Sequence, residues 1–145
     1  MRENPGFEAK AGAAARAMAA EGRTFAAAEY FDALDKTVAL RRVTAELFAE
    51  IDLVLTPTVA ALPWPAETPY PDVIAGRAAG PRDHAIFTGW ANIAGVPGIS
   101  LPIGLSHSGL PIGAQLVAAF GADDALLAFA GAVATDIPPL PVLED

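Results

Sequence analysis

The segment that most constrains the fold is residues 52–56, an almost continuously apolar run that stops at Pro57. Short runs of this kind are typical of strands buried on both faces, as in a parallel or mixed sheet. The preceding residues predict a long helix that is capped by Thr24 and reaches about Glu50. Its apolar side chains recur at helical spacing, at Phe31, Leu34, Val38, Ala45 and Phe48. Because a helix here leads directly into a buried strand, the sequence predicts an α/β fold.

Three further segments have the character of helices. Residues 8–21 are rich in alanine, which loses no side-chain entropy in a helix, and the glycine that follows them is expected to end this helix. Another helix is expected to begin at Asp83, as its cap, and to end at Gly95. A last helix is expected from Asp123, again as the cap, to about residue 135.

Strands and loops occupy the rest of the chain. Residues 57–81 contain six prolines and two glycines without periodicity, which predicts a long loop of the kind that often has a function. Residues 98–103 and 111–118 are expected to be strands, joined through a turn at 106–109. The tail, residues 136–145, is rich in proline and is expected to be extended rather than helical.

Composition narrows the classes of function. Of the 145 residues, 53% are hydrophobic and 18% charged, which is more apolar and less charged than is usual for a globular domain. The net charge of −8 argues against partners such as nucleic acid or an anionic membrane surface. No apolar stretch reaches the length of a membrane span, and residues 1–5 do not resemble a signal peptide, so a cytoplasmic protein is expected.

The sequence offers no convincing catalytic set and no metal or cofactor site. Without cysteine there is no disulfide, thiolate nucleophile or cysteine-ligated zinc, and the two histidines, His84 and His107, lie far apart. The only serines are Ser100, interpreted as a structural hydroxyl inside a strand, and the two that flank His107 in a turn. His84 is interpreted as a solvated or loop-bonded imidazole at the start of a helix, and Asp123-Asp124 as residues that stabilise a helix N-terminus.

Three segments together resemble one family. Residues 52–58 (DLVLTPT), 86–104 (IFTGWANIAGVPGISLPIG) and 109–117 (GLPIGAQLV) resemble the C-terminal third of amidase-signature enzymes, the serine hydrolases that cleave carboxamides. The residues that match in order and spacing are Asp52, Pro57, Thr58, Asn92, Gly95, Pro97, Pro102, Gly104, Gly109, Leu110, Pro111, Gly113 and Gln115, and Asp123 with Leu126-Leu127 matches the closing helix. The resemblance covers roughly residues 24–135 and implies an α/β/α sandwich around a mixed sheet.

The matching residues are interpreted as architectural. Glycines at 104, 109 and 113 permit tight turns and close approach of strands. Asn92 is expected to bond loop backbone, and Gln115 to satisfy a neighbouring carbonyl group. The chain is therefore interpreted as a single partial domain, with an Ala-rich helix in residues 1–23, the amidase-like segment in 24–135 and the tail in 136–145.

The resemblance implies amide hydrolysis by a serine nucleophile, a second serine in a cis peptide and a lysine base, all in the N-terminal half of the family's enzymes. This chain has no Ser-Ser pair, no Gly-Gly-Ser segment and no lysine at a matching position, so it is expected to be the C-terminal portion of an amidase and inactive alone. In glutamine-dependent amidotransferase subunits an Asp commonly precedes the Ile-Phe-Thr, where this chain has Ala85. A neutral or aryl/alkyl amide is therefore the expected substrate, with Ala85, Thr88 and Gly89 lining part of its acyl pocket.

Three alternatives stay open at this stage. The chain could be a non-catalytic interaction subunit, a fragment of a glutamine-dependent amidotransferase A-like subunit, or a translated fragment without a stable fold. The partners expected are a small-molecule amide, once an N-terminal portion completes the enzyme, and a complementing chain or a second copy in a homo-oligomer. No cofactor is expected.

Overall fold

A computed structural model describes residues 6 and 10–139 of the chain. By its contacts the chain divides into two compact units, Met1–Val38 and Ala39–Asp145. The sheet, the loop that follows its first strand and the motif residues all belong to the second unit.

The first unit contains helix α2 (Ala13–Gly22) and the beginning of helix α3 (Ala27–Glu50). The helix predicted over residues 8–21 is interrupted at Ala11 and Gly12, since Lys10 is helical and α2 begins at Ala13; residues 8 and 9 of the prediction lie outside the described residues. The predicted cap at Thr24 is wrong, because its hydroxyl donates back to the Glu21 carbonyl at 2.7 Å. Instead the Glu29 carboxylate accepts the Ala26 N–H at 2.7 Å, which satisfies a backbone donor at the start of α3.

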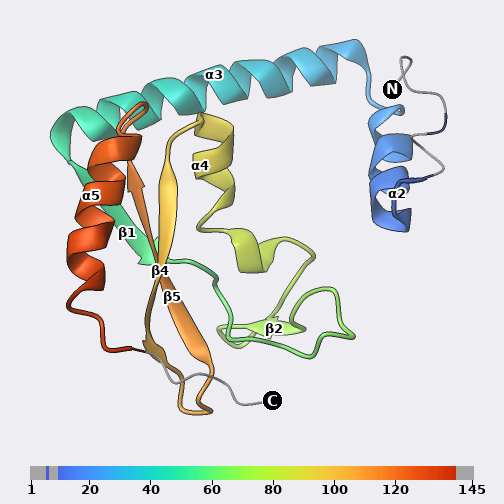
Figure 1. Cartoon of the computed structure of the whole chain (residues 1–145). Helices are drawn as coiled ribbons and strands as arrows, with labels where there is room; N and C mark the ends of the chain where they lie inside the picture. Colours follow the sequence, from blue (N-terminus) through green and yellow to red (C-terminus); the bar gives the residue numbers. More distant parts are fainter. Residues whose placement is uncertain (1–5, 7–9, 140–145) are drawn as a thin grey trace. The chain divides into compact units, whose positions relative to one another are not determined.

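A three-stranded sheet forms the centre of the second unit (Figure 1). Strands β1 (Leu53–Pro57), β5 (Pro111–Ala118) and β4 (Gly98–Leu105) lie in the order β1-β5-β4, and both pairings are antiparallel. The predicted α/β class is confirmed, and the strands fall where the sequence placed them. The expectation that residues 52–56 are buried on both faces is wrong for this chain, because Leu55 is 68% exposed on an edge strand.

Helix α5 (Asp123–Ala134) covers one face of the sheet (Figure 1). Leu126 and Ala130 of α5 pack against Leu116 and Ala118 of β5, and these four side chains are 2–6% exposed. Asp123 is not the cap as predicted, since Ala122 occupies that position. The two aspartates lie instead in the first turn, where their charge complements the helix dipole as expected.

The segment predicted as one helix from Asp83 to Gly95 is two. A 3₁₀ turn, η1 (Asp83–Ala85), is followed by helix α4 (Gly89–Ala94). The Asp83 carboxylate accepts the Gly80 N–H at 2.8 Å and so holds the preceding loop instead of capping a long helix. Gly95 ends α4 in the left-handed conformation with φ 77°, as predicted.

The Pro-rich loop contains a small hairpin that the sequence did not predict. Strands β2 (Val73–Ile74) and β3 (Arg77–Ala78) pair through Ala75 and Gly76, whose φ angles are 49° and 76°. Two successive left-handed residues match the twist of a two-residue hairpin, and alanine is an uncommon choice at such a position. The expected turn at 106–109 is present, with Gly109 at φ 80°.

No helix among the described residues is long and apolar enough to cross a membrane.

Candidate functional site

A polar layer lies on the sheet face opposite α5, because side chains alternate between the two faces of a strand. Its centre is Gln115 of β5, which is only 7% exposed. The Gln115 Nε2 atom donates to the Phe87 carbonyl oxygen at 2.8 Å and to Thr56 Oγ1 at 3.4 Å. The prediction that Gln115 satisfies a neighbouring carbonyl is confirmed. This bond ties the segment between η1 and α4 to the sheet.

A hydroxyl pair continues the same layer at the end of β1. The Thr58 and Ser100 hydroxyl oxygens lie 2.6 Å apart, and the Thr58 N–H donates to the Gly113 carbonyl at 2.9 Å. A Cβ atom on Gly113 would lie 2.8 Å from Thr58 Oγ1 and 3.0 Å from Ser100 Oγ. The predicted close approach at Gly113 is confirmed, and Ser100 has a hydrogen-bond partner, as expected of a structural hydroxyl.

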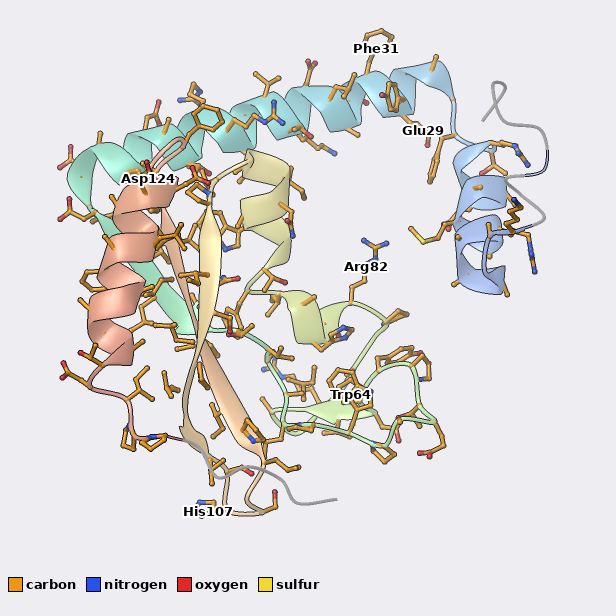
Figure 2. The ribbon with its side chains drawn as sticks, viewed as in Figure 1. Glu29, Phe31, Trp64, Arg82, His107 and Asp124 are labelled. Carbon is orange, nitrogen blue, oxygen red and sulfur yellow. The ribbon has the colours of Figure 1, made fainter. Side chains whose placement is uncertain are left out.

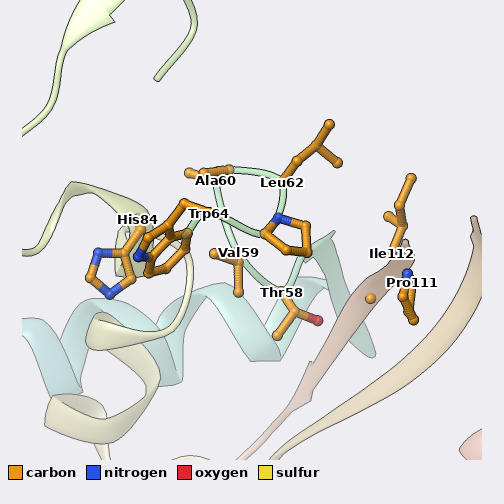
Figure 3. Close-up of a pocket in the computed structure, with 11 residues that line it drawn as sticks. Thr58, Val59, Ala60, Leu62, Trp64, His84, Pro111 and Ile112 are labelled. Carbon is orange, nitrogen blue, oxygen red and sulfur yellow. The ribbon is translucent and has the colours of Figure 1, made fainter. Parts of the chain in front are cut away.

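Beyond this pair opens a hollow of about 390 Å³ (Figure 3). It is lined by the start of the Pro-rich loop, His84 and the first residues of β5; in sequence order the lining is Thr58, Val59, Ala60, Ala61, Leu62, Pro63, Trp64, His84, Pro111, Ile112 and Gly113. Thr58, Trp64 and His84 are the lining residues whose side chains can form hydrogen bonds. The hollow is therefore apolar with a few polar groups, which is the usual character of a small-molecule site.

His84 differs from its prediction as a solvated or loop-bonded imidazole. Its Nδ1 atom is buried and has no hydrogen-bond partner among the described residues. Its ring lies against the Trp64 indole, with centroids 5.1 Å apart and planes inclined by 55°. Sequence reasoning missed this pair, and the signal that could have suggested it is a tryptophan between two prolines inside a long loop.

The predicted pocket residues Ala85, Thr88 and Gly89 lie around the break between η1 and α4. The Ala85 carbonyl accepts both the N–H and the hydroxyl of Thr88 at 3.1 Å, and Gly89 opens α4. None of the three lines the hollow beside Trp64. Nor does any of them line a neighbouring hollow of about 570 Å³, formed by the hairpin loop together with Asp83, Ile86 and Phe87.

The remaining motif residues occupy turns and strand ends. Asp52 precedes β1 and Pro57 ends it, while Pro97 precedes β4 and its carbonyl oxygen accepts the Ala118 N–H at 3.1 Å. Pro102 and Gly104 flank a register irregularity in β4. Asn92 of α4 donates to the Thr88 carbonyl at 3.4 Å.

The second histidine lies elsewhere. His107 is at the tip of the β4–β5 hairpin, away from Trp64 (Figure 2). Its neighbours Ser106 and Ser108 bond each other at 2.9 Å, and Ser106 Oγ also accepts the Leu110 N–H. Within the described part of the chain, no three His, Cys, Asp or Glu residues gather in a way that could hold a metal ion.

Comparison with known proteins now decides the family. A family model described as Amidase matches residues 3–127. The chain belongs to the amidase family. Among curated proteins it is 40% identical over 95 residues to the putative amidase AmiC of Mycobacterium leprae, which covers 63% of this chain and 19% of AmiC. It is 50% identical over 52 residues to the 6-aminohexanoate-cyclic-dimer hydrolase of Pseudomonas sp. (strain NK87), covering 36% of this chain and 10% of the hydrolase.

A third relative is a glutamyl-tRNA(Gln) amidotransferase subunit of Parvibaculum lavamentivorans, 36% identical over 89 residues that cover 61% of this chain and 17% of that protein. Among solved structures, a crystal structure of an amidase superimposes with a TM-score of 0.78 at 25% identity, over 88% of this chain and 29% of the amidase. The matches thus span a fifth or less of these curated relatives and under a third of that solved enzyme.

Proposed function

We propose that this chain is the C-terminal portion of an amidase that hydrolyses carboxamide C–N bonds through an acyl-enzyme. The observation that carries the proposal is the family match over residues 3–127, taken with the small share of each relative that the chain spans. The sequence contains no adjacent serines, so the nucleophile, the second serine and the lysine base of the family come from sequence outside these residues. A cytoplasmic location belongs to the same proposal.

In the complete enzyme this chain contributes part of the sheet and one wall of the substrate pocket. We assign that wall to Ala85, Thr88 and Gly89, which follow His84 and are held against the sheet through the bond from Gln115 to the Phe87 carbonyl. Ala85 offers a methyl group where a carboxylate would be needed to pair with the amino group of glutamine. This favours a neutral amide substrate over glutamine, and hence an amidase over an amidotransferase, although an amidotransferase protein is among the relatives.

A chimera tests this proposal. The chain replaces its superimposable segment in the solved amidase, with which 88% of its residues align. We expect the chimera to hydrolyse an amide that the parent amidase cleaves, and the purified 145-residue chain to show no turnover. A folded chimera without activity would contradict the proposal, as would turnover by the chain alone that persists after contaminants are removed.

A second candidate function is a non-catalytic interaction subunit that pairs with a partner or with itself. The observation that favours it is the exposure of apolar side chains on the two outer strands, with Leu55 68% and Ile103 52% exposed. Exposed apolar strand surface is a template for association. Size-exclusion chromatography with light scattering over a range of concentrations tests it: this candidate requires an obligate oligomer, and a monomer that unfolds cooperatively would exclude it.

A further inference from the structure

A groove lies in the second unit where the C-terminal half of α3 passes the end of α4 and the turn that precedes α5 (Figure 1). This α3–α4 groove is lined by one face of α3 between Arg41 and Ala49, by Ala94 to Val96 at the end of α4, and by Ala119 and Phe120. Its volume is about 600 Å³, within the usual range for sites that bind small molecules. None of the residues assigned above to the amide pocket lines it, so it is a separate candidate site.

Arg41 is the one charged residue, among those described, that lines the groove. Its Nε–H donates to the Ile93 carbonyl oxygen at 3.3 Å, which places the guanidinium where α3 meets the end of α4. No carboxylate pairs with it in the described part of the chain, although the sequence has seventeen acidic and nine basic residues. The next residue, Arg42, pairs with Glu46 at 2.6 Å and does not line the groove. The remaining N–H groups of Arg41 form a planar fork that matches a carboxylate.

The Thr44 hydroxyl has no hydrogen-bond partner among the described residues, although Thr44 is only 4% exposed. Earlier in the same helix, Thr37 donates its hydroxyl to the Ala33 carbonyl at 3.0 Å, the usual bond of a threonine inside a helix. The unpartnered side-chain atom that is closed off from solvent in the described chain is His84 Nδ1, so Thr44 Oγ1 still borders open space. Thr44 lines the groove, and the groove is that space. A ligand oxygen there would supply the bond that the hydroxyl lacks.

Two phenyl rings dominate the apolar part of the groove. Phe48 is half-buried in α3, and Phe120 is 84% exposed. The backbone that carries Phe120 is nevertheless fixed, because the Ala122 N–H donates to the Ala119 carbonyl at 3.0 Å and Gly121 has a φ of 77°. An exposed ring on a tight turn, next to a groove, favours contact with an apolar ligand. The groove thus combines an apolar surface with one cation and one unpaired hydroxyl.

From these features we propose that the α3–α4 groove binds an apolar monocarboxylate. The carboxylate accepts hydrogen bonds from the Arg41 fork and from Thr44 Oγ1, which are neighbours on one face of α3 because they are three residues apart. The alkyl chain lies against Phe48 and Phe120. Arg41 and Phe48 are seven positions apart, about 10 Å at the rise of a helix, a length that the chain of octanoate can span. This site goes beyond the proposed amidase function and does not depend on it.

Titration of the 145-residue chain with octanoate, below its micelle concentration, tests the proposal by NMR. The amide resonances of Gly95, Val96 and Phe120 should shift, whereas those of Ser108 and Gly109 in the β4–β5 turn should not. Octanoate should bind about tenfold more tightly than butanoate, because the longer chain buries more methylene groups. It should bind about fivefold more tightly than octan-1-ol, which has the same chain without the charge. Octylammonium should not shift these resonances, since the Arg41 cation repels it.

Helix α3 provides a matched control for each polar contact. Arg41→Gln should weaken octanoate binding about fivefold and abolish the preference over octan-1-ol, whereas Arg42→Gln should leave the affinity unchanged because Arg42 does not line the groove. Thr44→Val should weaken octanoate about threefold, and Thr37→Val should not. Because the Thr44 hydroxyl has no partner in the chain itself, Thr44→Val should fold as well as the unaltered chain. This variant therefore separates loss of binding from loss of structure.

The proposal is overturned if octanoate binds no better than octan-1-ol, or if the Arg41 and Thr44 variants bind octanoate as well as their controls. If Arg41→Gln loses its helical circular dichroism, Thr44→Val and the comparison of ligands in the unaltered chain decide. Saturation-transfer NMR on the chimera and its Arg41→Gln variant adds a last comparison. Octanoate binding by the chain but not by the folded chimera would mean that the rest of the amidase fills the groove, and would also overturn the proposal. Binding by a folded but inactive chimera would reject the amidase proposal and keep the carboxylate site.

Discussion

Replacing Gly113 by alanine is the sharpest test of how the polar layer of the sheet is built. Gly113 lies in β5 opposite Pro102 of β4, and its carbonyl accepts the Thr58 N–H at 2.9 Å. An added Cβ would lie 2.8 Å from Thr58 Oγ1, 3.0 Å from Ser100 Oγ and 3.3 Å from Thr58 Cβ. Bonds on both sides of the strand prevent β5 from moving away, so the two hydroxyls must separate.

Three contributions determine how much Gly113→Ala changes the free energy of unfolding. Inserting one carbon into a packed site costs about 1–3 kcal/mol, and loss of the hydroxyl pair costs about 1 kcal/mol. Alanine also restricts the unfolded chain more than glycine, which offsets about 0.5–1 kcal/mol. We therefore expect Gly113→Ala to lower the free energy of unfolding by about 2 kcal/mol.

Urea unfolding followed by circular dichroism measures this change. Gly131→Ala is the matched control, because Gly131 lies inside α5 with nothing within 4 Å of an added Cβ, and it should stabilise the chain by about 1 kcal/mol. In a Thr58→Ala background the nearest clash is gone, so the cost of Gly113→Ala should fall below about 1 kcal/mol. The reasoning is refuted if Gly113→Ala does not lower the free energy of unfolding of the otherwise unaltered chain. It is also refuted if Gly113→Ala lowers that free energy by the same amount in the Thr58→Ala background.

Three further predictions concern single contacts. Gln115→Leu leaves the Phe87 carbonyl without its donor and should cost about 1–3 kcal/mol of unfolding free energy in urea titrations, whereas an effect within experimental error would mean that water replaces the bond. Ala75→Asn should raise the stability by about 0.5–1 kcal/mol, because asparagine tolerates the φ of 49° better than alanine; an unchanged thermal midpoint would contradict strain at this turn. Glu29→Ala removes the acceptor of the Ala26 N–H, so amide exchange in the first turn of α3 should accelerate while exchange in α5 stays the same; equal rates before and after the change would argue against the cap.

The parts of the fold that depend on local chemistry could be predicted from the sequence. The strand at 111–118 and the left-handed glycine at 95 were predicted correctly. An apolar run and a glycine that follows a helix determine the conformation of the backbone at their own positions. The cap at Thr24 failed because two helices follow each other closely and its hydroxyl bonds the first instead of opening the second. Local preference alone does not choose between two such acceptors.

Features that join distant residues escaped prediction. Thr58 and Ser100 are 42 positions apart, and their hydrogen bond depends on strand register, which no local pattern specifies for a three-stranded sheet. The same holds for Trp64 and His84, which lie against each other where the Ala60 N–H also donates to the His84 carbonyl. Within the site, the architectural role of Gln115 was predictable from a polar side chain in a buried strand. The contact between Trp64 and His84 could not be predicted, because it depends on the path of a loop whose sequence has no periodicity.

The apolar composition has a physical consequence that can be measured at one residue. Leu55 lies in β1 beside Leu116 of β5 yet is 68% exposed, because α5 covers the neighbouring core but not this end of the sheet. Leu55→Thr should therefore change the unfolding free energy of the isolated chain by less than about 0.5 kcal/mol. If this surface is covered in a complete amidase, the same change in the active chimera should cost about 2 kcal/mol, the value of burying most of a leucine side chain. Leu105, 40% exposed on the opposite outer strand, provides a second position for the same comparison. Equal and small effects in both proteins would mean that the excess of apolar residues does not arise from surface that another part of the enzyme covers.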